Sequence, residues 1–397
     1  MSVAPALPLS LYVHLPWCVK KCPYCDFNSH ALRGNLPESE YMRALLEDLA
    51  EELHRASGRS VDSVFFGGGT PSLFSADAIG SVLDTVDRQG MLGGDAEISL
   101  EANPGTVERG RFTDFAAVGV NRISLGAQSF DPKQLTVLGR IHSSADIWVA
   151  LDEIHAAGIN NFNLDLMYGL PGQDVAGAMA DLEQAVRAGP SHISHYQLTI
   201  EPNTLFHIRP PALPGEDSVA DTEIACAERL AAAGYRRYEI SAYAREGSQC
   251  RHNINYWSFG DYLGVGAGAH GKLTCLQTAG ADLSVSRRWK LRHPSAYMSA
   301  THSRLDGDAL ISGPQLRFEF MLNTLRLTAG FDEQQYQMRT GLPVSGLLPY
   351  LEKLAAEDLM ESDGQGHWHA TGRGLRFLND LQARFLPNDE QAQAGNG

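Results

Sequence analysis

The stretch that decides the fold lies close to the start of the chain and reads Leu11-Tyr-Val-His-Leu-Pro-Trp-Cys18-Val-Lys-Lys-Cys22-Pro-Tyr-Cys25-Asp-Phe-Asn-Ser-His30. Three of the six cysteines of the 397-residue chain therefore stand within one short loop, in a Cx3CxxC spacing. Three thiolates this close together can hold one metal centre, but a structural zinc site and an ordinary four-iron cluster each use four protein ligands. The spacing therefore predicts a metal centre with one position left open.

Two other uses of these cysteines are weaker alternatives. A zinc ribbon needs a second CxxC pair, whereas Cys226, Cys250 and Cys275 stand singly. A disulfide framework is typical of small secreted chains, and the N-terminal MSVAPALPLS lacks the basic and apolar regions of a secretory signal. The pattern favours an iron-sulfur cluster over zinc or inert thiols.

The loop resembles the cluster loop of the radical S-adenosylmethionine (SAM) family, since the cysteines follow Tyr12-x-His14-x-Pro16. The resemblance implies a [4Fe-4S] cluster on Cys18, Cys22 and Cys25. It also implies that the open iron chelates the amino and carboxylate groups of SAM. We expect His14 to orient the loop rather than to bind metal.

The composition describes an ordinary soluble protein, with 43% hydrophobic and 20% charged residues. No apolar run approaches the roughly 18 residues of a transmembrane helix, so we expect a cytoplasmic protein in a reducing compartment that suits thiolate ligands. The formal net charge of -15 opposes non-specific binding to nucleic acid or anionic membranes. We therefore expect no nucleic-acid partner and no direct contact with a membrane.

Strands and helices alternate through residues 1–245, which predicts an α/β domain with a parallel sheet. Six predicted strands (9–15, 61–66, 97–100, 122–125, 162–167 and 192–200) make a partial (β/α)6 barrel, since the full eight units take about 250 residues. Chemistry gathers at the carboxyl ends of the strands in such barrels. The cysteines, the GGGTP and EANP segments, Gln128 and Asp165 all stand there.

The pattern changes after Tyr235. We predict a strand at 238–243, a connecting region at 246–311, a smaller, mainly helical, winged-helix-like C-terminal domain at 312–388 and a disordered tail at 389–397. Winged-helix units often bind DNA, but from Val344 onward four Lys and Arg stand against eight Asp and Glu. This balance favours a packing or partner module.

Several residues near the strand ends suit a bound nucleoside. The glycines of Gly67-Gly68-Gly69-Thr70 let backbone groups approach a ligand closely. Glu101 and Asp165 can accept hydrogen bonds from ribose hydroxyls or an ammonium group. Gln128 offers an amide, and Arg140 offers a guanidinium that suits a carboxylate. Each alone fits a solvated strand end equally well.

Five segments, read in order, are similar to those of the oxygen-independent coproporphyrinogen III oxidases, a group within the radical SAM family. They are GGGTPS at 67–72, LEANP at 100–104, SLGAQSF at 124–130, LGRIH at 138–142 and NLDLMYGLPGQ at 163–173. The resemblance covers nearly the whole chain. It implies SAM contacts at Tyr12, Gly68, Gly69, Thr70, Glu101, Gln128, Arg140 and Asp165, and at Ala269 or His270.

Two departures favour a sister family of heme chaperones with the same fold. The oxidase has a further cysteine two residues after the third ligand, where this chain continues Cys25-Asp26-Phe27. The oxidase also has a longer extension before the first strand, whereas 11 residues precede Tyr12. The HNxxYW motif of the chaperones stands here at 252–257. The resemblance thus implies a protein that binds heme and passes it on.

The motif can be interpreted in two ways. His252 can supply an axial imidazole to heme iron and Tyr256 and Trp257 can offer aromatic faces, with Arg251 or the basic run 287–292 near the propionates. Alternatively, the motif buttresses the joint between the barrel and the C-terminal domain.

The predicted function is a heme chaperone, with an active radical SAM decarboxylase of coproporphyrinogen III as the rival. The chaperone is the better supported of the two, but whether the chain is an enzyme stays open. The expected partners are heme, a heme-accepting apoprotein and an electron donor, and a homodimer stays open.

Overall fold

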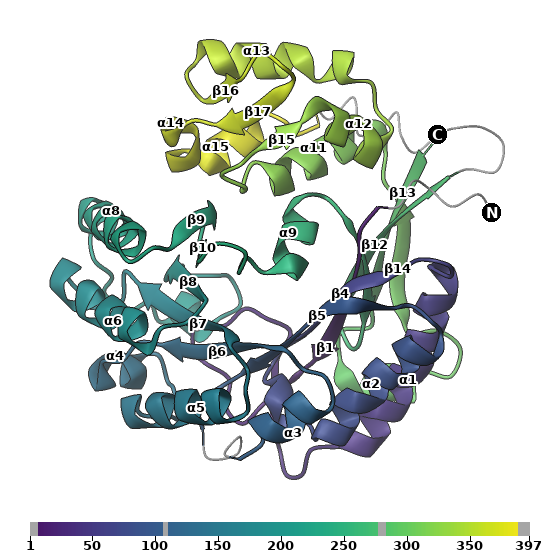
Figure 1. Cartoon of the computed structure of the whole chain (residues 1–397), viewed down its shortest axis with the longest axis vertical. Coiled ribbons are helices and arrows are strands. Elements are labelled where there is room, and N and C mark those ends of the chain that lie inside the picture. Colours follow the sequence, from purple (N-terminus) through teal and green to yellow (C-terminus); the bar gives the residue numbers. More distant parts are fainter. Residues whose placement is uncertain (1–6, 106–109, 277–282, 388–397) are drawn as a thin grey trace.

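The computed structural model describes residues 7–105, 110–276 and 283–387, and a curved sheet forms its centre (Figure 1). Six parallel strands pair in chain order, each with the next, and helices lie in the connections. The predicted partial barrel is therefore confirmed. Its strands are β1 (Leu9–Leu15), β4 (Val61–Gly68), β5 (Leu92–Ala102), β6 (Arg122–Gln128), β7 (Asn161–Tyr168) and β8 (His192–Gln197).

Helices cover the outer face of this sheet (Figure 1). The sequence predicts one of these helices at 107–118, and in the structure α3 begins at Phe112, while residues 106–109 lie outside the described ranges. The outer helices are α1 (Glu38–Arg55), α2 (Ala76–Arg88), α3 (Phe112–Ala117), α4 (Pro132–Val137), α5 (Ser144–Ala156), α6 (Val175–Ala188) and α8 (Glu216–Ala232).

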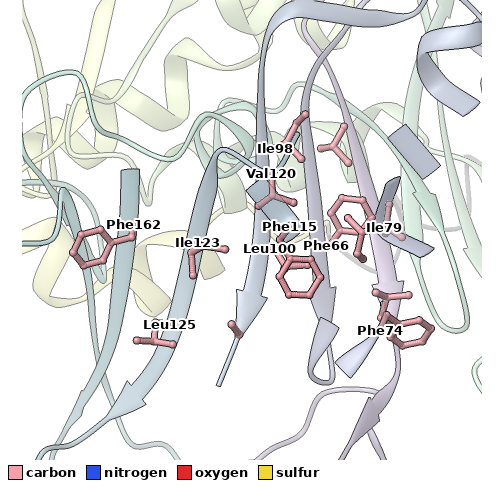
Figure 2. Close-up of a cluster of buried hydrophobic side chains, with 14 of the residues drawn as sticks. Phe66, Phe74, Ile79, Ile98, Leu100, Phe115, Val120, Ile123, Leu125 and Phe162 are labelled. Carbon is pink, nitrogen blue, oxygen red and sulfur yellow. The ribbon is translucent and has the colours of Figure 1, made fainter. Parts of the chain in front are cut away.

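Strand β6 shows how the sequence divides side chains between the two faces of the sheet. Successive side chains of a strand point to opposite faces. Ile123 and Leu125 belong to the core between the sheet and the helices, as Figure 2 shows. Ser124 and Gln128 instead line a cavity on the inner face. The apolar residues thus pack against the helices, and the polar residues face the cavity, where they can contact a ligand.

Helix α2 illustrates the packing of the outer layer. Ser75 caps its N-terminus by accepting a hydrogen bond from the N–H of Ala78 at 3.1 Å. Ile79, Val82 and Val86 follow at helical spacing and are completely buried. Ile79 packs among the strand side chains in Figure 2.

The region predicted as a connection, 246–311, extends the barrel sheet. β11 (Asp261–Val265) pairs in parallel with β1, and β12 (His270–Leu276), β13 (Leu283–Lys290) and β14 (Leu305–Leu310) continue antiparallel. At the opposite edge, the predicted strand 238–243 is two strands, β9 (Arg236–Glu239) and β10 (Ala242–Ala244), which fold back beside β8. In the described chain this gives one sheet of 12 strands.

The C-terminal unit has its own core and lies above the barrel in Figure 1. Its three-stranded sheet and helices match the winged-helix expectation. The sequence predicts one helix over 372–386, and the structure has two short helices there. The elements are α11 (Gly313–Thr324), β15 (Phe331–Asp332), α12 (Glu333–Thr340), η2 (Val344–Gly346), α13 (Leu348–Ala356), β16 (Met360–Ser362), β17 (His367–Ala370), α14 (Gly372–Arg376) and α15 (Leu378–Ala383). The predicted tail at 389–397 lies outside the described residues. Among the described residues, no helix is both long and apolar enough to cross a membrane.

A buried ion network ties the first helix to the added strands. The Nζ of Lys290 on β13 lies 2.5 Å from a carboxylate oxygen of Asp48 and 2.8 Å from one of Glu52, both on α1. Tyr297 on α10 (Pro294–Ser299) donates to Asp48 at 2.6 Å. Burial raises the pKa of Asp48, and Lys290 opposes that rise. Lys290 is the cation that pairs with Asp48, and Glu52 is contacted by Arg55 and Arg288 as well.

We expect replacement of Lys290 by Met to destabilise the protein by about 3–5 kcal/mol, because it leaves the buried carboxylate of Asp48 without its cation. Glu52 would keep its ion pairs with Arg55 and Arg288. Urea denaturation at pH 7 measures the change. The control Glu47→Gln removes a largely exposed partner of Arg304 and should cost less than about 1 kcal/mol. If both variants lost the same free energy of unfolding, a special role for the buried network would be contradicted.

Candidate functional site

A cavity of about 500 Å³ lies at the carboxyl ends of β4 to β8, beneath the cysteine loop. Its walls bring together most of the residues predicted from the sequence, although these come from segments far apart in the chain. They are Cys18, Cys22, Cys25, Gly68, Gly69, Thr70, Glu101, Gln128, Arg140 and Asp165. Tyr12, His252 and Ala269 are not in its lining.

The glycines at the end of β4 let the cysteine loop approach the strand. A Cβ on Gly68, which has φ +114°, would lie 2.5 Å from the His14 ring, and one on Gly69 would lie 2.5 Å from the Trp17 carbonyl oxygen. The N–H groups of Gly69 and Thr70 donate to Leu15 and Trp17 at 2.9 and 2.7 Å. These N–H groups therefore hold the loop, and ligand contact through them stays a prediction.

Further contacts fasten the loop to its surroundings. Lys21 Nζ donates to the carbonyls of Phe27 and Ser29 at 2.9 and 3.1 Å. Asn28 donates to the carbonyls of Ala267 and Arg292 at 2.9 Å. The Nε2 of His14 lies 2.9 Å from the carbonyl oxygen of Asn28, which supports its expected orienting role.

The thiols of Cys18, Cys22 and Cys25 line the cavity together. In the described residues, no group of three or more His, Cys, Asp and Glu side chains is arranged to hold one metal ion. Ligands of a cluster each bind a different iron, so their sulfurs need a wider spacing than those around zinc. Burial raises the pKa of the Cys18 and Cys25 thiols, and repulsion between thiolates adds to the rise. A cationic cluster would offset both effects.

The carboxyl groups of Glu101 and Asp165 line the cavity, and neither forms an ion pair among the described residues, although the charge of Arg122 lowers the pKa of Asp165. Burial, followed by repulsion from Asp165, raises the pKa of Glu101 to about 8, although the N–H of Gly68 donates to it at 3.1 Å. Burial also raises the pKa of Asp165, against hydrogen bonds from Asn163 and Ser124 at 2.8 and 3.3 Å. A cationic or hydroxyl-bearing ligand would stabilise their ionised forms.

Arg140 links the cysteines to the strand ends. Its Nη1 lies 3.5 Å from Cys22 Sγ, and its Nη2 donates to the Gly126 carbonyl at 2.8 Å and to Asn103. Its buried Nε has no partner among the described residues. Asn103 lies within the EANP segment, but the sequence analysis assigned it no role. Its place between Thr70 and Arg140 became visible only in the fold.

Gln128 adopts an unusual backbone conformation at the end of β6. Its φ is +68°, a left-handed value that is uncommon for a residue with a side chain. The Oε1 of Gln128 accepts a hydrogen bond from the hydroxyl of Tyr196, another cavity residue that the sequence analysis missed. Such strain is often found at ligand sites.

Comparison with known proteins places the chain in a family. Residues 12–185 match the model of the radical SAM superfamily, and residues 311–377 match the HemN C-terminal domain. The heme chaperone HemW of Escherichia coli is 46% identical over 379 residues, which cover 96% of this chain and 98% of the relative. HemW of Haemophilus influenzae is 44% identical, with coverage of 96% and 99%.

The chain belongs to the HemW family.

More distant relatives share the same architecture. A mitochondrial radical SAM domain-containing protein 1 of Mus musculus is 36% identical, with 96% of this chain and 88% of the relative covered. The solved structure of coproporphyrinogen III oxidase (HemN) from Escherichia coli superimposes with a TM-score of 0.80 at 22% identity, covering 97% and 91% of the two chains. That likeness supports the fold, and the family membership confirms the predicted cluster and SAM as its cofactors.

The structure places the HNxxYW motif of this HemW family member on α9 (Arg251–Trp257), between the barrel and the C-terminal unit (Figure 1). The His252 ring is buried against Phe65 and Tyr12, with centroids 5.1 and 6.3 Å apart. Asn255 donates to Ser10 and to the carbonyl of Asp261 at 2.8 Å each. These contacts support the buttressing interpretation, and heme ligation by His252 stays a prediction.

Aromatic and basic groups proposed for heme are already engaged. Trp257 packs against Tyr256 and beneath the Arg326 guanidinium, 4.4 Å from its ring centroid. The sequence alone also allows 287–292 to be a solvated basic run, and that interpretation is wrong for three of its residues. Arg287 pairs with Glu319, Arg288 with Asp308 and Glu52, and Lys290 with Asp48 and Glu52.

Tyr12 and Ala269 lie behind the cavity wall. The hydroxyl of Tyr12 lies 2.9 Å from His14 Nδ1, so Tyr12 supports the loop through that ring. Ala269 is buried, and its carbonyl accepts from the N–H of Lys290 at 2.9 Å. Contacts of both residues with SAM remain predictions.

The raised pKa of Glu101 predicts how the stability of the cofactor-free protein depends on pH. Between about pH 4.5 and 8 the native protein keeps a proton that the unfolded chain has released, so this group lowers stability as pH rises. The difference in free energy of unfolding between Glu101→Gln and the wild type should therefore shift in favour of the variant as pH rises. We expect a shift on the order of a few kcal/mol between pH 4 and pH 8.5.

Urea denaturation of both proteins across this range measures the difference. A matched control is Glu201→Gln, which changes a carboxylate elsewhere in the cavity lining. If the difference in free energy of unfolding between the wild type and Glu101→Gln did not change with pH, the protonated, buried state of Glu101 would be contradicted.

Proposed function

We propose that this protein is a heme chaperone, which binds heme and transfers it to an acceptor protein while carrying a [4Fe-4S] cluster and exchangeable SAM. The observation that carries the proposal is identity of 46% with the heme chaperone HemW of Escherichia coli over nearly the full length of both chains. The arrangement of the cavity is compatible with this function.

The residues of the cavity divide into two groups in this proposal. Cys18, Cys22 and Cys25 would hold three irons, and Arg140 beside Cys22 would balance thiolate charge. Glu101 and Asp165 would receive the ammonium and ribose of SAM in the protected interior. When bound, the cluster and SAM supply one-electron chemistry.

Other parts of the proposal rest on the sequence alone. Reduction of the cluster would require an electron donor. The cytoplasmic location and the homodimer are predictions of the same kind. The acceptor would be an apoprotein that takes heme, and any membrane contact would be made through it.

We expect Cys22→Ser to abolish the visible absorption of the reconstituted cluster, because a hydroxyl is a poor substitute for a thiolate on iron. Absorbance after anaerobic reconstitution with iron and sulfide measures the result. The control Cys275→Ser changes an exposed thiol outside the cavity and should leave the cluster intact. A normal cluster in Cys22→Ser would refute the ligand assignment.

Two assays separate the chaperone from a decarboxylase. Titration of the purified protein with heme should produce a saturable Soret band, and the heme should then move to an apoprotein acceptor. The reconstituted protein, given reductant, SAM and coproporphyrinogen III, should form no protoporphyrinogen above background. Turnover at enzymatic rates, or absence of heme binding, would overturn the proposal.

A further inference from the structure

We propose that heme binds in a second cleft, on the other side of the cysteine loop from the cluster cavity, with His30 as its axial ligand. This inference rests on the proposed function and adds the place where heme is held. The cleft has a volume of about 610 Å³ and lies between residues 29–37 and the start of α10. That volume is within the roughly 300–1,000 Å³ of small-molecule sites.

The cleft offers the three kinds of group that heme requires. Heme needs an axial ligand, apolar or aromatic surface for the ring and cations for its propionates. Two histidines and a methionine line the cleft, as do apolar side chains and an exposed cation. Those that bear on heme are His30, His293, Met298, Leu32 and Arg33.

Of the two imidazoles, His30 is the better ligand. Its Nε2 has no hydrogen-bond partner among the described residues. Burial, and then His293, Lys21 and Arg292, lower the pKa of His30, which favours the neutral ring that binds metal. His293 accepts at Nδ1 from the N–H of Ser295 at 3.3 Å, so that nitrogen is already engaged.

The exposed His293 ring stands beside the proposed ligand. The two ring centroids are 5.4 Å apart and the planes meet at 70°, an edge-on contact. The Nε2 of His30 is buried, so heme must displace a neighbouring side chain to reach it. His293 is exposed, so its side chain can turn away once its hydrogen bond with the N–H of Ser295 is broken.

The walls of the cleft are well positioned for a rigid site. Asn28 bonds the loop to the carbonyl of Arg292, next to His293, and Lys21 bonds the loop to itself. Arg33 is exposed and has no ion-pair partner among the described residues, so its guanidinium is available to a propionate. The ring of the rival ligand, His252, does not face a cleft in this way, because Phe65 and Tyr12 pack against it.

Heme titration of His30→Ala tests the site in the full-length protein. We expect affinity to fall by about tenfold or more, since loss of even an outer partner of a metal ligand costs roughly 10–100-fold. We also expect the Soret band to shift, and added imidazole to restore it. The matched control His302→Ala removes an exposed histidine outside the cleft and should bind heme like wild type.

A second variant keeps the test valid if His30→Ala disturbs the loop. Arg33→Glu reverses an exposed charge and should weaken heme binding several-fold, while binding of heme dimethyl ester, which lacks propionate charge, should not weaken. The site would be overturned if both variants bound heme with the affinity and spectrum of the wild type. It would also be overturned if the Soret band changed only in His252→Ala. Failure of the wild type to bind heme would instead overturn the proposed function.

Discussion

The close approach between the end of β4 and the cysteine loop is the constraint on which the site depends. Because Gly68 and Gly69 have no Cβ, the His14 ring and the Trp17 backbone can occupy the space beside them. Backbone N–H groups of the strand end then hold the loop, and the N–H of Gly68 holds Glu101. Loop, strand end and carboxylate therefore form one unit, and a side chain at either glycine would separate them.

Charge balance distinguishes the carboxylates of the cavity from those that stabilise the fold. Asp48 and Glu52 share Lys290, and Asp261 is paired with Lys272 and Arg59. Glu101 has no ion-pair partner in the described chain, and Asp165 raises its pKa further. Burying carboxylates without a partner costs folding free energy. The position of Glu101 and Asp165 is therefore best explained by a ligand that supplies their missing hydrogen bonds or charge.

The sequence predicted the cavity well because its residues follow strand ends, and parallel strands bring their ends together. It failed where a side chain's role depends on a distant partner. Lys290 looked solvated because Asp48 and Glu52 are some 240 positions away. The placement of β11 beside β1 was also missed, since its glycine-rich surroundings gave a weak strand signal. A lone His30 carries no signal at all before the cleft is seen.

The loop between the cluster cavity and the proposed heme cleft gives the two sites a physical connection. β2 (Trp17–Cys18) pairs with β3 (His30–Ala31), so Trp17 lies opposite His30 and Cys18 opposite Ala31. Binding of metal to thiolates orders the segment that carries them. An order imposed at Cys18 would therefore pass through the paired backbone to His30. On this view the cysteines contribute to heme binding without touching heme, because they fix the strand that presents its ligand.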